Sequence, residues 1–443
     1  MTDKNIIESE ASQPSPLGQT SFQDLAYRFK ERFSWKNTFA ALKYPNYKLW
    51  FMGQIISLFG TWMQTTAEGF LIFELTHSPV YLGYVGFATG IPAWLFMFYG
   101  GVVADRLPRR SVIIATQSTM MLLALTLAVL TFTHTVQAWH IIALAFGLGI
   151  ANAFDAPARQ SFLLELVDKD DLVNAIALNS TMFNSARAIG PAVAGVVYAL
   201  FGPAWCFTLN GLSFIGVISA LTKMKFKSTI SLEKTKSVFA DVKEGLNYAL
   251  TQPMIRTLIG LVAVINLFGI SFVTLIPAWA VTVLHGDATT NGIMQSARGI
   301  GALATALFIA TIGSSKYTYR LLSIGIFSFP LVLLFFASVK WLPASLLALV
   351  GTGSAIILIF NLSNAIIQSL VNDTLRGRVM SVYTFTSFGF MPIGALIIGV
   401  LANNLGEPLA VTICTIITLI FSVLAWLYIN KIEKTSVVRN ITD

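Results

Sequence analysis

The sequence contains few charged residues, two cysteines and four histidines. Charged residues make up only 11% of the 443 residues, whereas soluble domains carry roughly a quarter, so a soluble globular fold is excluded. Both cysteines, Cys206 and Cys414, lie inside apolar runs, which leaves no basis for a disulfide framework or a thiolate metal site. The histidines form no H-x-x-x-H pair, and we expect neither a metalloenzyme nor a bound cofactor.

Apolar residues, by contrast, make up 55% of the chain and give it a mean hydropathy of +0.71. They form continuous runs rather than alternating patterns, which favours membrane-spanning helices over a β-barrel. Twelve spans are expected, at residues 49–73, 80–103, 111–133, 138–157, 176–200, 203–222, 256–284, 290–313, 320–338, 343–366, 379–402 and 407–430. The sequence therefore predicts an all-α membrane protein with 12 transmembrane helices.

A polar stretch divides these spans into six and six, and the two halves are nearly equal in length. Gln160-Ser161 after the fourth span is matched by Gln368-Ser369 after the tenth, which indicates a duplicated six-helix unit. Two pseudo-symmetric six-helix bundles are typical of a secondary transporter that holds its substrate at the interface between them. The expected regions are a disordered tail at 1–20, a cytoplasmic amphipathic segment at 21–48, the N-terminal bundle at 49–222, a cytoplasmic linker at 223–255, the C-terminal bundle at 256–430 and a cytoplasmic tail at 431–443.

The basic residues of the chain predict its orientation. Of the 29 lysines and arginines, only Lys340 falls in the loops of one side, and Arg187 and Arg298 fall inside spans. The others lie on the opposite side, so the positive-inside rule puts both termini in the cytoplasm. The net charge of +8 follows from this topology, and no nucleic acid partner is expected. Phe22, Leu25, Phe29 and Phe33 recur at helical spacing. This pattern predicts a helix that lies on an anionic lipid surface.

The segment from Gly101 to Arg110, Gly-Val-Val-Ala-Asp-Arg-Leu-Pro-Arg-Arg, closes the second span. It resembles the G-x-x-x-D-[RK]-x-G-[RK]-[RK] signature of the major facilitator superfamily, with Pro108 where the signature has glycine. In that superfamily the motif is a latch that ties the two halves together on the cytoplasmic side and favours the outward-open state. The resemblance implies a latch made of Gly101, Asp105, Arg106, Arg109 and Asp155. The alternative is that the arginines only set the topology.

Further segments resemble the branch of this superfamily that contains the enterobactin exporter and related drug exporters, the transmembrane secretion effector type. They are Gly60–Gln64, Ala104–Arg110, Ala156–Gln160, Asn174–Asn179, Ala186–Pro191 and Leu375–Val379. In the fifth span, Gly190, Pro191 and Gly195 resemble the antiporter signature G-P-x-x-G-G, with Ala194 in place of one glycine. Such residues kink a helix and permit close helix approach, although ordinary small-residue packing is the alternative. The resemblance implies export by alternating access with proton antiport. The fourth span lacks the arginine of the superfamily's proton-transfer motif, so proton coupling would need another group.

Charged and amide side chains inside the spans are candidates for a site, because burying a charge in hydrocarbon is costly. They lie on polar stripes at helical spacing, and four such helices are predicted to enclose a wettable cavity for substrate and protons. The residues expected to line it are Glu68, Gln64, Arg187, Arg298, Asn361 and Asn364. There are two alternatives: amide side chains that bond to one another between packed helices, and a permanent ion pair between Glu68 and Arg298.

Two arginines against one carboxylate leave a surplus positive charge, which predicts an anionic substrate with Arg187 as its main contact and Glu68 as the proton-exchanging group. We expect a monomeric transporter of a bacterial inner membrane whose partners are a small molecule, protons and membrane lipids. The resemblance makes a siderophore the first expected cargo, a hydrophobic drug-like compound the second and a lysophospholipid the third. The alternatives are an uptake permease driven by proton symport and a non-transporting membrane sensor or scaffold. An enzyme is not expected, because no nucleophile–base pair, metal set or phosphate-binding loop occurs in the sequence.

Overall fold

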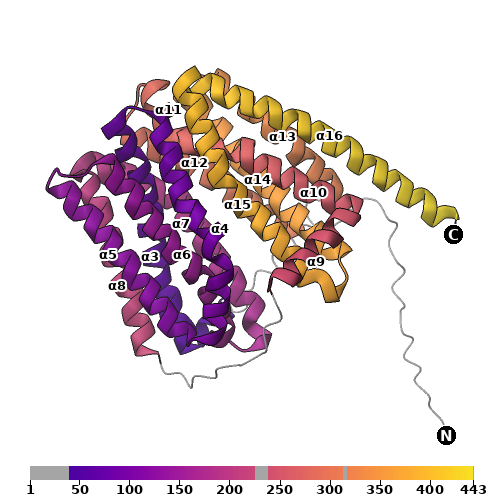
Figure 1. The fold of residues 1–443 in the computed structure, drawn as a ribbon, viewed down its shortest axis with the longest axis horizontal. Helices are drawn as coiled ribbons and strands as arrows, with labels where there is room; N and C mark the ends of the chain where they lie inside the picture. The colour runs from indigo at the N-terminus through magenta and orange to yellow at the C-terminus, as the bar shows by residue number, and fades with distance from the viewer. Residues whose placement is uncertain (1–38, 225–237, 313–316, 443) are drawn as a thin grey trace, which may run out of the picture.

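The computed structural model describes residues 39–442 of the chain, apart from 225–237 and 313–316, and these residues form helices joined by short loops (Figure 1). No strand occurs in this part of the chain, and the all-α fold class is confirmed. The tail expected at 1–20 and the amphipathic pattern that begins at Phe22 lie outside the described residues.

Six long helices form the N-terminal bundle. They are α3 (Pro45–Thr76), α4 (Pro79–Arg106), α5 (Arg109–Phe132), α6 (Ala138–Leu166), α7 (Leu172–Phe201) and α8 (Pro203–Lys223). A proline begins three of these helices, at a position where its missing N–H sacrifices no helical hydrogen bond. Two short 3-10 helices accompany them, η1 (Ala40–Lys43) before α3 and η2 (Lys169–Asp171) before α7.

The C-terminal bundle begins with an interrupted span. This span consists of α10 (Pro253–Val264), a π-helical turn η3 (Ile265–Gly269), a 3-10 helix η4 (Ile270–Leu275) and α11 (Ile276–Thr282). Five continuous helices follow, α12 (Ala288–Ile312), α13 (Thr318–Ser338), α14 (Leu342–Leu370), α15 (Asp373–Leu405) and α16 (Glu407–Thr442).

Nine helices of the described chain are long and apolar enough to cross a membrane, with the interrupted span counted as one. Helix α4 is a tenth when the parts on either side of its 58° bend are counted together. Helices α3 and α7 are 32 and 30 residues long and are less apolar. With these two helices, the number of long helices in the described chain is consistent with the 12 expected spans.

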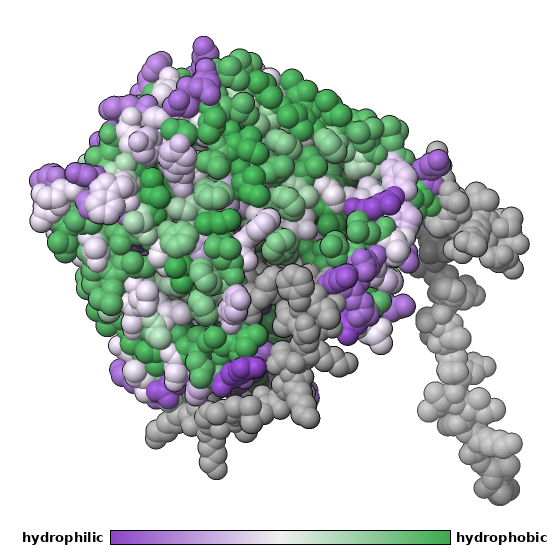
Figure 2. Space-filling model, viewed as in Figure 1, coloured by the Kyte–Doolittle hydropathy of each residue, from purple (hydrophilic) through white to green (hydrophobic). Residues whose placement is uncertain are grey.

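The outer surface of the bundles is apolar. Figure 2 shows hydrophobic residues across most of the visible face, with hydrophilic residues gathered at its margins. Large hydrophobic side chains are exposed on helices of both bundles, for example Leu122, Leu212, Phe335 and Leu424. An apolar surface of this extent suits contact with lipid rather than water. The chain is therefore a multi-pass membrane protein.

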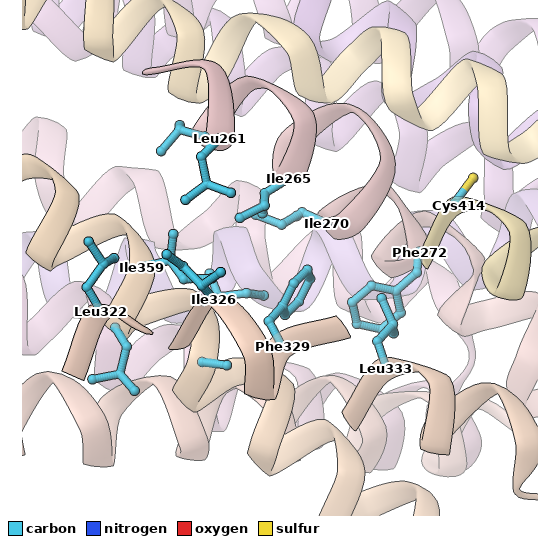
Figure 3. Close-up of a cluster of buried hydrophobic side chains, with 14 of the residues drawn as sticks. Leu261, Ile265, Ile270, Phe272, Leu322, Ile326, Phe329, Leu333, Ile359 and Cys414 are labelled. Atoms are coloured by element: carbon cyan, nitrogen blue, oxygen red, sulfur yellow. The ribbon is translucent and has the colours of Figure 1, made fainter. Parts of the chain in front are cut away.

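The irregular turns of the seventh span are held by packing against α13. Figure 3 shows side chains of this span, among them Ile265 and Phe272, facing Phe329 and Leu333 of α13. Gly269 permits this contact, because a Cβ atom there would lie 2.6 Å from Cε1 of the Phe329 ring. Irregular backbone is tolerated inside a membrane only where protein or a cavity surrounds it. The apolar core of the C-terminal bundle therefore stabilises a helix break that sequence patterns do not reveal.

The linker between the bundles contains an unexpected helix, α9 (Val238–Thr251). It packs against the start of α15, beside which it lies in Figure 1. Arg378 Nη1 of α15 forms an ion pair of 2.7 Å with Glu244 Oε2 of α9. Gly245 brings the two backbones together, since a Cβ atom there would lie 2.6 Å from the carbonyl oxygen of Arg378. The described part of the linker thus docks onto the C-terminal bundle.

The two faces of the membrane protein can be distinguished by the linker. We call the side that carries Pro45, Lys223 and Pro253 the linker side, because residues 224–252 connect the bundles there, and the opposite side the far side. On the linker side, Tyr44 donates hydrogen bonds to Asp168 and Asp171, and Lys43 lies 2.6 Å from Asp171. The hydrogen bond to Asp171 raises the pKa of Tyr44 to about 12. This cluster ties the chain before α3 to the loop between α6 and α7.

The two bundles contact one another on the far side. Ser78 Oγ lies 2.7 Å from Asn403 Oδ1, which joins the start of α4 to the end of α15. The same helices are so close that a Cβ atom on Gly83 would lie 2.8 Å from the carbonyl oxygen of Ala395. Figure 1 shows the bundles close together near α11 and diverging toward the ends of α8 and α9. The structure is therefore closed on the far side.

Two adjacent glycines of α4 differ in their packing, and their substitution tests the fold. A Cβ atom on Gly100 would lie 2.2 Å from the carbonyl oxygen of Ala153 in α6, whereas one on Gly101 would meet nothing within 4 Å. We expect Gly100→Ala to destabilise the protein by about 1–3 kcal/mol, because the two helices must move apart. Gly101→Ala serves as the matched control and should leave stability unchanged. The measurement is the midpoint of thermal unfolding of the purified protein in detergent, and equal midpoints for the two variants would contradict this packing.

Candidate functional site

A cavity of about 390 Å³ lies between the two bundles. Helices α3, α4 and α6 line it from the N-terminal half, and η4, α11, α12 and α15 line it from the C-terminal half. Most of its walls are apolar, and the polar side chains in them are Thr65, Glu68, Thr89, Thr274 and Gln295. The interruption of the seventh span places Thr274 in this wall. The cavity is thus a substrate-sized space formed jointly by both halves.

Glu68 is the one predicted site residue that lines this cavity. Its side chain is only 6% exposed. The ion pairs of the described residues do not include Glu68 or Arg298, so the alternative of a permanent pair between them is not formed. A buried carboxyl group without a cation partner faces a cavity shared by the two halves.

Gln64 lies between helices rather than in this cavity. Its Oε1 accepts a hydrogen bond of 2.6 Å from Nδ2 of Asn210 in α8, and Gln64 is only 6% exposed. Gly60, one turn earlier, lets the two helices come together, because a Cβ atom there would lie 2.6 Å from Oδ1 of Asn210. This part of the polar stripe of α3 therefore holds α3 to α8. It follows the alternative in which amide side chains bond to one another between packed helices.

Arg187 of α7 and Arg298 of α12 come from opposite halves and meet where these helices cross. A Cβ atom on Gly299 would lie 2.6 Å from Cα of Ala188 and 2.7 Å from the carbonyl oxygen of Arg187. The backbones of the two helices therefore lie in contact beside both arginines, which carry like charges. Within the described chain, Nε of each is buried without a hydrogen-bond partner, and no carboxylate forms an ion pair with either.

The surroundings of the two arginines differ. Arg298 is only 5% exposed, whereas Arg187 is half-buried with its guanidinium 5.9 Å from the centre of the Trp62 ring. The Trp62 face is a favourable position for a cation. Neither arginine is among the residues that line the 390 Å³ cavity around Glu68. The arginines instead form a separate positive site at the α7–α12 contact.

The two asparagines of α14 lie apart from this cavity as well. Asn361 is exposed and Asn364 is half-buried. The Oδ1 of Asn364 accepts a hydrogen bond of 2.5 Å from Nε2 of Gln368, one turn later in the same helix. Neither asparagine lines the cavity around Glu68. The amide side chains of Asn364 and Gln368 therefore bond to one another within α14, and the two asparagines do not share the cavity with Glu68.

The latch motif has different partners from those expected. Asp105 and Arg106 are exposed and form no ion pair within the described chain. Arg109 pairs with Glu165, near the end of α6. Hydropathy ends the fourth span at residue 157, whereas α6 continues to Leu166, so the sequence pattern does not point to Glu165. Gly101 borders open space, so close packing does not require a glycine there.

Asp155, the third expected latch residue, is fully buried inside the N-terminal bundle. Its Oδ2 lies 2.6 Å from Nε of Arg159, one turn later in α6. Its Oδ1 accepts hydrogen bonds from Thr116 at 2.7 Å and Gln117 at 3.1 Å, both in α5. This network joins α6 to α5, and Asp105 is not part of it.

The antiporter-like residues of α7 form close helix contacts. A Cβ atom on Gly190 would lie 2.7 Å from Cβ of Trp62 in α3, and one on Gly195 would lie 2.8 Å from the carbonyl oxygen of Ala288. The carbonyl oxygen of Pro191 would lie 2.3 Å from a Cβ atom on Gly292 of α12. These small residues let α7 pack tightly against both α3 and α12.

Comparison with known proteins places these features in a family context. The family described as transmembrane secretion effector matches residues 36–440. The staphyloferrin A transporter of Staphylococcus aureus is 24% identical over 87% of this chain and 96% of its own length. The enterobactin exporter of Salmonella typhimurium is 25% identical over 83% and 88%. The multidrug efflux pump Tap of Mycolicibacterium fortuitum is 24% identical over 78% and 87%.

The fold is similar to that of solved transporters. A POT family transporter crystallised with 5-aminolevulinic acid superposes with a TM-score of 0.68 at 12% sequence identity, over 87% of this chain and 96% of the other. At this identity the likeness concerns the fold alone. It supports the major facilitator architecture of two six-helix bundles.

Substituting the two aspartates of the expected latch separates a structural role from a surface role. Asp155→Ala leaves Arg159 without its carboxylate in a buried network, and we expect a loss of stability of about 3 kcal/mol. Asp105→Ala removes an exposed side chain without an ion pair and should leave stability unchanged. Thermal unfolding of both variants in detergent is the measurement. An Asp155→Ala variant as stable as the wild type would contradict the buried network.

Proposed function

Because this chain belongs to the transmembrane secretion effector family of the major facilitator superfamily, we propose that it exports a small siderophore-like or drug-like organic anion by alternating access. The three relatives support this kind of cargo, since they are named as a siderophore transporter, a siderophore exporter and a multidrug efflux pump. One observation carries the anionic character of the cargo: Arg187 and Arg298 lie on either side of the α7–α12 contact between the halves, and no carboxylate of the described residues forms an ion pair with either.

An anion is the ligand that best satisfies this pair of arginines. A buried charge without a partner is strongly unfavourable, and two like charges side by side add repulsion. A carboxylate or another oxyanion would accept hydrogen bonds from both guanidinium groups, whose planar shape suits paired oxygen atoms. Arg187 is the main contact, because it is the less buried of the two and can meet a ligand first.

The position of the arginines on opposite halves supports a role in alternating access. The α7–α12 contact carries two like charges, one from each half. A bound anion removes this repulsion and connects both halves through one ligand. Binding therefore favours a state in which the halves approach around the cargo, which is the step that alternating access requires.

We propose that the linker side is cytoplasmic and that the membrane is a bacterial inner membrane. Almost all lysine and arginine residues of the loops lie on that side, in line with the positive-inside rule. A structure closed on the far side then corresponds to a state that receives cargo from the cytoplasm, as export requires. Both arginines and the cavity come from one chain, which supports a monomer as the working unit.

The latch expected from the motif belongs to the opposite state in this proposal. Asp105 and Arg106 are exposed at the linker-side end of α4, free to make new contacts when the linker-side ends of the bundles approach. Arg109 would then exchange Glu165 for the latch, or hold both. The exposure of Asp105 here is consistent with a latch that forms only in the outward-open state.

Glu68 is the proposed proton-exchanging group. It is a carboxyl group without a cation partner, buried in a mostly apolar cavity that both halves line. A carboxyl group in such surroundings can take up a proton in one state and release it when the other state exposes it to water. Export would then be driven by proton antiport.

Substitution of the arginines tests the anionic cargo. We expect Arg187→Gln and Arg298→Gln each to reduce transport of enterobactin or staphyloferrin A into everted vesicles by about tenfold or more, because each removes charged hydrogen bonds to the anion. Arg256→Gln is the control, since Arg256 is exposed at the start of α10 and, among the described residues, bonds only to Tyr428. Full transport by both the Arg187→Gln and the Arg298→Gln variant would contradict the proposal. Uptake in the reverse direction would favour a permease.

Substitution of Glu68 tests the proton coupling. We expect Glu68→Gln to bind cargo but to lose the response of transport to an imposed pH gradient, because glutamine cannot carry the proton. Glu74→Gln, on the same helix but outside the cavity, is the matched control and should keep that response. The measurement is cargo flux into proteoliposomes with and without a pH gradient. Undiminished coupling in Glu68→Gln would assign the proton to another group.

A further inference from the structure

A second cavity, of about 380 Å³, lies on the linker side of the N-terminal bundle between α3, α6 and α7. We call it the linker-side pocket. Trp50, Gln54 and Leu58 line it from α3, and Arg159 from α6 and Phe183 from α7 complete its main walls. None of these residues lines the cavity around Glu68. It is therefore a separate space with its own chemistry.

The pocket holds polar groups without partners. Gln54 is only 2% exposed, and its Oε1 has no hydrogen-bond donor anywhere in the described chain. A buried carbonyl oxygen of this kind is unfavourable unless a donor reaches it. Arg159 uses its Nε for Asp155, while its terminal amino groups bond to nothing among the described residues. The pocket thus offers one buried acceptor and one cationic donor.

The other walls suit a flat apolar body. Trp50 is buried and packs edge-on against Phe162, which fixes its ring in the wall. Phe183 is 45% exposed at the rim and provides a second aromatic surface. Aromatic side chains in such positions bind rings by stacking or edge contacts.

The pocket is connected to the arginine site by direct contacts. Phe183 lines the pocket and packs against Trp62 at 5.7 Å between ring centres. Trp62 in turn lies under the guanidinium of Arg187. On α3, Trp50, Gln54, Leu58 and Trp62 follow steps of four, so one helix face leads from the pocket to this pair. The aromatic pair Trp62–Phe183 therefore stands between the linker-side pocket and Arg187.

We propose that the linker-side pocket is a first binding site for the cargo, and that it takes an aromatic ring carrying a hydroxyl or amide donor and a carboxylate or carbonyl acceptor. The donor bonds to Oε1 of Gln54, the acceptor to the terminal amino groups of Arg159, and the ring lies against Trp50 and Phe183. The role as first site rests on the proposed export function, because only then does the ligand move on past Trp62–Phe183 to Arg187.

The test uses 4-hydroxybenzoate and benzoate as probes, which differ only in the hydroxyl donor. Binding to the purified full chain in lipid nanodiscs is followed by ligand-observed NMR titration. We expect 4-hydroxybenzoate to bind about fivefold to tenfold more tightly than benzoate, as one hydrogen bond to a buried acceptor provides. Gln54→Leu should abolish this preference, and the exposed control Gln252→Leu should keep it. A preference that survives Gln54→Leu overturns the proposal.

Two further variants test whether the probes bind in the linker-side pocket. Phe183→Ala, at the exposed rim, should weaken both probes several-fold, and unchanged binding would overturn the proposal even if Gln54→Leu did not fold. Arg187→Gln should keep the preference for the hydroxyl, because the probe lies in the pocket; loss of the preference would place the probe at the arginine site and overturn the assignment. The protein could show a preference that depends on Gln54 and yet export neither enterobactin nor staphyloferrin A. In that case the pocket remains a binding site, and only the export function is contradicted.

Discussion

Arg187 and Arg298 carry like charges into the contact between α7 and α12, where no carboxylate of the described chain neutralises them. A charged side chain within a membrane protein is costly unless an opposite charge or a hydrogen-bond partner lies beside it. The close crossing of the two helices at Gly299 keeps the guanidinium groups together instead of letting them separate. In the proposed function an anionic cargo completes this contact, so that cargo binding and the movement of the halves depend on the same two side chains.

The buried charges of the N-terminal bundle follow the opposite principle. Asp155 is satisfied by Arg159 and by two hydrogen-bond donors of α5, so it stabilises one bundle as a rigid unit. Glu68 has no such network and lies in the cavity between the bundles. A carboxyl group without a partner at the interface suits a rocking motion, because the energy that changes between states is then concentrated at the interface.

The linker-side pocket lies within one bundle, whereas the arginine site lies between the two bundles. Its unpaired Gln54 and Arg159 lie within one bundle, so a ligand there need not connect the halves. The Trp62–Phe183 pair separates this pocket from the arginine site, which does connect them. A cargo could thus be selected by shape and hydrogen bonding before it meets the charges that couple to conformational change. Helix α9, docked on α15 through Glu244 and Arg378, lies on the same side of the molecule.

The all-α class and the superfamily could be recognised from the sequence, because hydropathy and short motifs depend on residues close together in the chain. The three buried charges could also be found there, since each interrupts an apolar run. Their partners could not. Gln64 meets Asn210, Arg109 meets Glu165 and Arg298 meets Arg187 across separations that only the folded bundles bring together. Likewise, the break in the seventh span and the pocket around Gln54 depend on packing against distant helices, so tertiary structure alone decided them.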